Sequence, residues 1–139
     1  MNFDRPDLFL RIHARHGHYC PMSTLGGRLG VAALSALGGG AGELAAIYHI
    51  ETCAVDGIAV AIGCSPEVKA AGRHRLELRA GDGRGVAAEL TAEALAQAAA
   101  CRKRLDAGED ADAVLARLRT AATEELIVLI PLASEAADA

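Results

Sequence analysis

The chain has 139 residues, a length typical of one domain, and a formal net charge of −4 at pH 7. Acidic and basic residues are interspersed without a basic stripe or interleaved aromatic side chains, which argues against nucleic-acid binding. With no tryptophan, two phenylalanines and two tyrosines, the core must consist mainly of leucine, isoleucine, valine and alanine.

The N-terminal residues do not resemble a secretory signal. Charged residues and a proline at positions 4–7 interrupt any apolar segment there. The longest aliphatic run, Leu126–Ile130, is too short to span a bilayer. We therefore expect a cytoplasmic protein without membrane association, in which the cysteines stay reduced. Cysteines in that setting are typically metal ligands, catalytic groups or core residues.

Apolar residues at helical spacing predict a short helix over Phe3–Ile12. A second helix is expected to begin near Ser23 or Thr24, either of which can cap it, and to end before Gly38. Residues 43–51 are typical of a strand, and residues 55–62 form the next helical stripe.

Two alternating runs, His74–Arg79 and Val86–Leu90, flank a Gly-Asp-Gly turn and predict a β-hairpin. Thr91 is expected to cap a long alanine-rich helix that reaches Leu105. Another helix over Asp112–Ala122 and a strand over Leu126–Leu132 complete the chain. A hairpin with segregated helices predicts one α+β domain over residues 1–139, with helices packed on a mixed or antiparallel sheet.

The run His16-Gly17-His18-Tyr19-Cys20-Pro21 places two imidazoles and a thiol within five positions. Imidazole and thiolate are the ligands that zinc prefers. Gly17 permits a tight turn, so His18 and Cys20 are predicted as ligands, and His16 can share their face. The alternative is a surface loop that carries these histidines without a ligand role.

Cys53 and Cys64 follow in a single later segment, with Asp56 between them. Each cysteine is either a ligand from a second segment or a small buried hydrophobe. Asp56 either caps the helix over 55–62 or accepts the second N–H of a ligand histidine and so orients it. Cys101 shares helical spacing with alanines and is predicted to pack in the core.

These motifs, with Gly27–Gly30 and Glu51–Ile58, resemble in order and spacing the E-subunit family of formylmethanofuran dehydrogenase. The resemblance implies an α+β core, often dimeric, with a His/Cys-lined cavity that can bind a metal, commonly zinc. Two positions depart from the family pattern: Met22 stands where a glycine is usual, and Ser65–Lys69 replaces a glycine-rich stretch. Many members also carry a cysteine-rich C-terminal module, which has no counterpart in these residues, so we expect the core domain alone.

The leading hypothesis is a zinc-binding protein whose site supports metal-assisted hydrolysis or lyase chemistry. The metal ligands are predicted to be His18, Cys20, Cys53 and Cys64, with His16 and Asp56 as supporting or acid–base groups. The alternative is a non-enzymatic accessory protein that handles metal or sulfur for a redox enzyme of the molybdenum type. A third hypothesis is a dimerisation module whose cavity has lost its function. The resemblance also leads us to expect a homodimer.

Overall fold

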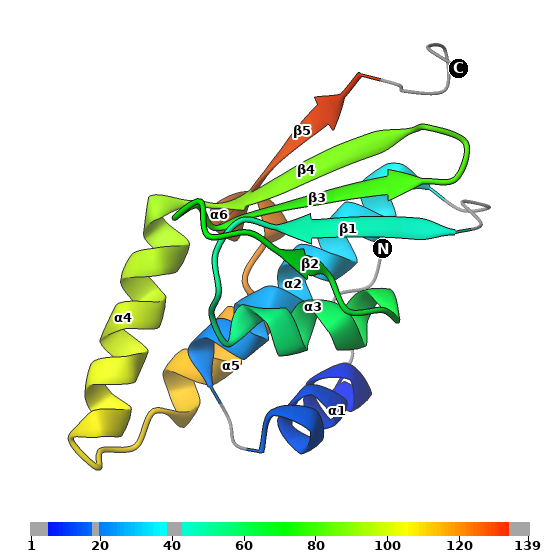
Figure 1. The fold of residues 1–139 in the computed structure, drawn as a ribbon. Helices are drawn as coiled ribbons and strands as arrows, with labels where there is room; N and C mark the ends of the chain where they lie inside the picture. Colours follow the sequence, from blue (N-terminus) through cyan, green and yellow to red (C-terminus); the bar gives the residue numbers. More distant parts are fainter. Residues whose placement is uncertain (1–5, 18–19, 39–42, 134–139) are drawn as a thin grey trace.

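The structure is a computed structural model that describes residues 6–17, 20–38 and 43–133 (Figure 1). Its five strands are β1 (Leu44–Tyr48), β2 (Glu67–Val68), β3 (Arg75–Ala80), β4 (Gly85–Leu90) and β5 (Ile127–Leu132). They form a sheet in the order β2-β1-β3-β4-β5. The pair β1–β2 is parallel and the other pairs are antiparallel, which confirms the predicted mixed sheet.

The helices are α1 (Pro6–His16), α2 (Pro21–Leu37), α3 (Ala54–Ile62), α4 (Ala92–Asp106), α5 (Asp112–Thr120) and α6 (Thr123–Leu126). Helix α2 packs along one face of the sheet with α3 beside it, and α1 lies against both of these helices (Figure 1). Helices α4 and α5 extend away from one end of the sheet (Figure 1). Within the described ranges, no helix is long and apolar enough to cross a membrane.

Alternation along the strands explains why the helices cover one face of the sheet. In β3, Leu76 and Leu78 are fully buried, whereas Arg75 and Glu77 point to the opposite face and form an ion pair there. The buried face belongs to one apolar cluster with α2 and α3. Its members are mainly leucine, isoleucine and alanine, as the composition predicted.

Helices α2 and α3 touch backbone to backbone at glycines. A Cβ added to Gly57 would lie 1.9 Å from the carbonyl oxygen of Ser23, and one added to Gly26 would lie 2.1 Å from that of Ala54. Both distances are far inside van der Waals contact, so only glycine fits at either position. This contact involves the first two turns of α2 and the first turn of α3, and it therefore brings the N-terminal ends of the two helices together.

Two predicted boundaries were wrong. Helix α1 extends to His16 rather than ending at Ile12. Helix α2 begins at Pro21, with Cys20 as its N-cap, rather than near Ser23 or Thr24. Proline suits the first helical position because its φ is already helical and its missing N–H has no partner there to lose. The two hydroxyls instead donate hydrogen bonds to the carbonyl oxygen of Cys20.

Gly57→Ala tests the contact between α2 and α3. Alanine favours an isolated helix by about 1 kcal/mol over glycine. Here the added Cβ must push the two backbones apart, so we expect the free energy of unfolding to fall by about 2 kcal/mol or more. Urea denaturation would measure this change. Ser35→Ala, at an exposed position of α2, serves as the control; equal stability of both variants would contradict the contact.

Candidate metal centre

Three side chains converge where α1 ends and where α2 and α3 begin. His16, Cys20 and Cys53 each offer one ligand atom, and these atoms all lie within 4.8 Å of one another. His16 is the last residue of α1, Cys20 is the N-cap of α2, and Cys53 is the N-cap of α3. The close approach of α2 and α3 at their glycines therefore brings the two thiols into one site.

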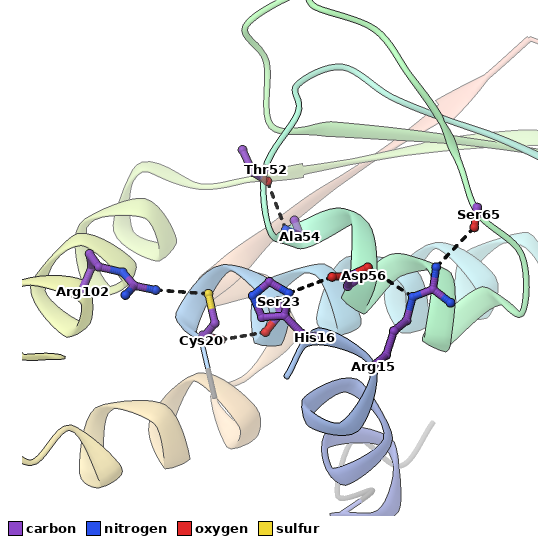
Figure 2. Close-up of polar contacts among 9 residues, drawn as sticks. All are labelled: Arg15, His16, Cys20, Ser23, Thr52, Ala54, Asp56, Ser65 and Arg102. Carbon is purple, nitrogen blue, oxygen red and sulfur yellow. Dashed lines mark hydrogen bonds and ion pairs between the residues drawn. The ribbon is translucent and has the colours of Figure 1, made fainter. Parts of the chain in front are cut away.

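Cys20 is held firmly by its own backbone. It is extended, with φ −146° and ψ 136°, and its side chain is 1% exposed. Its carbonyl oxygen accepts hydrogen bonds from the hydroxyls of Ser23 and Thr24 at 3.1 and 2.9 Å. In the other segment, Thr52 Oγ1 accepts a hydrogen bond from the backbone N–H of Ala54 and fixes the chain beside Cys53 (Figure 2). Hydrogen bonds therefore fix the backbone at or next to both cysteines.

The pKa of Cys53 is raised above its ordinary value, first by burial and then by the neighbouring Cys20 thiol. The charge of Arg102 opposes this shift. Cys53 is therefore protonated at neutral pH in the absence of a cation. A metal that binds to its sulfur must displace that proton, which makes binding weaker as the pH falls.

His16 is oriented by a carboxylate. Its Nδ1 lies 2.7 Å from Asp56 Oδ2, and Asp56 Oδ1 accepts a hydrogen bond from Arg15 Nε at 3.2 Å (Figure 2). The pKa of Asp56 is lowered, chiefly by its hydrogen bond to His16. The ionised carboxylate holds the proton of the ring on Nδ1, so that Nε2 is the basic nitrogen. Of the two roles expected for Asp56, the structure shows the contact with a histidine.

Arg102 also reaches the site, although no sequence motif includes it. It projects from α4, and its Nη2 donates a hydrogen bond to Cys20 Sγ at 3.4 Å (Figure 2). Its Nη1 lies 3.7 Å from Asp106 Oδ1 on the same helix. Eighty-two positions separate Arg102 from Cys20, and no local pattern in an alanine-rich helix marks such a residue. Its contact with the site arises from the tertiary fold.

The other predicted site residues are placed differently. His18 lies outside the described residues. Cys64 follows the C-cap Gly63 of α3, so a nine-residue helix of about 14 Å separates it from Cys53. It lines a cavity of about 350 Å³ together with Arg11, Arg15 and Ser65. Within the described part of the chain, His16 rather than Cys64 joins the two thiols.

Cys101 has the packing role expected of it. It is fully buried in a small apolar cluster with Ala111 and Leu115. Burial is also the main reason why the pKa of its thiol is raised. Of the cysteines, Cys20 and Cys53 alone stand in the His/Cys group found among the described residues.

A family model described as FmdE, molybdenum formylmethanofuran dehydrogenase operon, matches residues 15–131 and so includes His16, Cys20 and Cys53. The chain belongs to the FmdE family. The crystal structure of a tungsten formylmethanofuran dehydrogenase E-subunit (FmdE)-like protein from Syntrophus aciditrophicus is similar to this FmdE-family chain. Its TM-score is 0.71 at 20% sequence identity, with 95% of this chain and 73% of that chain covered. This likeness shows a shared fold. None of the functionally curated proteins matches the sequence significantly.

The donor set fits a metal of the zinc class. Two thiolates and one imidazole are borderline-soft ligands, which suit zinc better than magnesium or calcium. Tetrahedral zinc, with bonds of about 2.0–2.3 Å, keeps its ligand atoms about 3.5 Å apart. The three ligand atoms lie within 4.8 Å of one another, a range that includes this spacing. A carboxylate that accepts a hydrogen bond from the histidine, as Asp56 does from His16, is also typical of metal sites.

Exposure predicts the order in which the thiols react with iodoacetamide. Cys53 and Cys64 are partly exposed, whereas Cys20 and Cys101 are buried. We expect native protein to be alkylated first at Cys64, more slowly at Cys53 because of its raised pKa, and last at the buried pair. Mass spectrometry of timed digests would measure this order. Added zinc should protect Cys53 and leave Cys64 reactive; equal protection of both would contradict the placement of Cys64 outside the site.

Proposed function

We propose that this FmdE-family protein is a zinc-dependent enzyme whose metal is bound by His16 Nε2, Cys20 Sγ and Cys53 Sγ. The observation that supports this proposal is the convergence of these ligand atoms within 4.8 Å, with His16 held by Asp56. Catalytic zinc sites typically use three protein ligands, Cys₂His among them, and keep a fourth position for water or substrate. The proposed reaction class is metal-assisted hydrolysis or lyase chemistry.

The chain's own residues have separate tasks in this proposal. Zinc held by these ligands would act as a Lewis acid and would lower the pKa of a bound water to about 7. Asp56 fixes the ring of His16, and Arg15 holds Asp56 from the other side. Cys20 is buried and Cys53 is partly exposed, so Cys53 is the ligand nearer to solvent, and the partly exposed Arg102 lies beside Cys20. His18, predicted as a ligand from the sequence, would close the site if it also bound the metal.

A second candidate is the accessory protein that delivers metal or sulfur to a redox enzyme. The partial exposure of Cys53 favours it, because an acceptor thiol can reach that ligand. The family description, which names a dehydrogenase operon, is consistent with such a partner. An enzyme should retain its metal in the presence of excess glutathione, whereas a delivery protein should release it. The homodimer stays a proposal that the family resemblance supports, and the cytoplasmic location stays a proposal as well.

Metal analysis of purified variants tests the ligand set. We expect one zinc per wild-type chain, and strong loss of zinc in Cys20→Ser, Cys53→Ser and His16→Ala because each removes a direct bond. Cys64→Ser is the matched control and should retain its zinc. Inductively coupled plasma mass spectrometry would measure the stoichiometry.

Equal, substoichiometric metal in the wild type and all variants would contradict the proposed site. His18→Ala then separates two forms of the site. Full retention of zinc supports three protein ligands, whereas loss would mean that four ligands close the site and that its role is structural or in delivery.

Asp56→Asn tests the orientation of His16. Asparagine has no negative charge, so it cannot replace the carboxylate that accepts a hydrogen bond from the His16 imidazole. Loss of such a partner typically weakens metal binding about 10- to 100-fold. Competition with a chromophoric chelator would measure the zinc affinity. Asp82→Asn, at an exposed turn, is the matched control. An unchanged affinity in Asp56→Asn would mean that the carboxylate does not support a metal ligand.

A further inference from the structure

Arg102 brings a positive charge to the site from a helix outside the His/Cys motifs. Its guanidinium donates to Cys20 Sγ at 3.4 Å, and its side chain is 43% exposed. The buried thiol is thus in contact with a group that also faces solvent. A ligand that approaches the proposed metal from this side would meet the guanidinium.

The charges around the proposed metal do not cancel. Two thiolates and Asp56 contribute three negative charges, and His16 is neutral when it is a ligand. A divalent metal, Arg15 and Arg102 contribute four positive charges, since Arg15 is paired with Asp56 and Arg102 contacts Cys20. These groups sum to one positive charge, which among the described residues only Asp106 offsets. Asp106 Oδ1 lies 3.7 Å from Arg102 Nη1, beyond hydrogen-bond distance, and Asp106 is 69% exposed, so an anion in the site can replace it as the partner of Arg102.

The need to neutralise the two thiolates does not explain why the positive charge of Arg102 lies beside the site. Without this arginine, the divalent metal and Arg15 already balance the two thiolates and Asp56. A guanidinium beside a balanced site is better explained by an additional anion. Its planar fork of N–H donors matches a carboxylate, and one hydrogen bond to sulfur leaves further donors for such a ligand.

We propose that the fourth ligand of the metal is a small carboxylate and that Arg102 binds this carboxylate. The inference rests on the proposed function, because the anion needs the metal at His16, Cys20 and Cys53. It goes further in naming the charge and chemical class of the ligand, and in assigning a binding residue on α4. Arg102 then selects for an anion over a neutral ligand of similar size.

Spectroscopy of the Co(II)-substituted protein tests this proposal without any assay of activity. Thiolate-to-cobalt charge-transfer bands would report metal bound to the cysteines, and the visible d–d bands would report a change at the fourth position. Acetate is the anionic probe and imidazole the neutral one. We expect wild-type protein to bind both, with saturable changes in the d–d bands.

Arg102→Ala should weaken acetate about tenfold or more, since a charge-assisted hydrogen bond is lost. Imidazole affinity should not change in this variant, and Arg102→Lys should restore part of the acetate affinity. Arg104→Ala on the same helix is the matched control. Asp106→Asn removes the neighbour of Arg102 but keeps the guanidinium, so acetate should bind as well as in the wild type or better.

The outcomes separate the two proposals. Absence of charge-transfer bands would overturn the metal site and this inference with it. Bands with equal acetate affinity in wild type and Arg102→Ala would overturn the role of Arg102 and leave the metal site standing. Bands with no response to either probe would mean a closed site, which overturns the anion ligand and the open position of the proposed enzyme but leaves the metal ligands standing.

Discussion

The site depends on the contact between the backbones of α2 and α3. At Gly26 and Gly57 the two helices approach more closely than any side chain would allow. Because the contact lies near the N-terminal end of each helix, it sets the distance between the N-cap residues, which are Cys20 and Cys53. A wider crossing would keep both helices on the sheet but separate the thiols. The glycines therefore cost helix propensity locally and determine the geometry of the site.

A second constraint places α2 itself. Arg28 is 1% exposed, and its guanidinium donates hydrogen bonds to the carbonyl oxygens of Leu118 and Ala121. A buried charge is tolerated only when such partners satisfy it. These bonds join α2 to the end of α5, so the helix that carries Cys20 is fixed both to the sheet and to the C-terminal helices. Burial lowers the pKa of Arg28. The side chain nevertheless stays charged, because the pKa of a guanidinium is ordinarily far above neutral pH.

Much of the fold was predictable because its signals are local. Alternation in residues 75–80 and 85–90 and the turn between them indicated the hairpin, and Thr91 caps α4 through its hydroxyl as expected. The site was only partly predictable. The motif placed Cys20 and Cys53 together, but the choice between His16 and Cys64 depends on where helices end. His16 lies at the last turn of α1, whereas Cys64 lies beyond the far end of α3. Arg102 depends on the packing of α4, which no local pattern encodes.

The elements that carry the proposed ligands are positioned by apolar burial. Leu25, Leu29 and Ile58 are fully buried in the main cluster, next to the segments that bear Cys20 and Cys53. In small zinc domains, by contrast, the free energy of metal binding is needed to fold the chain. Here the core and the glycine contact position the ligand side chains before any metal binds. Metal binding therefore does not have to offset the entropy lost when the chain becomes ordered. In the proposed site, metal affinity would then depend mainly on the groups around the donors, which are Asp56 behind His16 and Arg102 beside Cys20. Charge at these two positions can therefore tune the site without altering the fold.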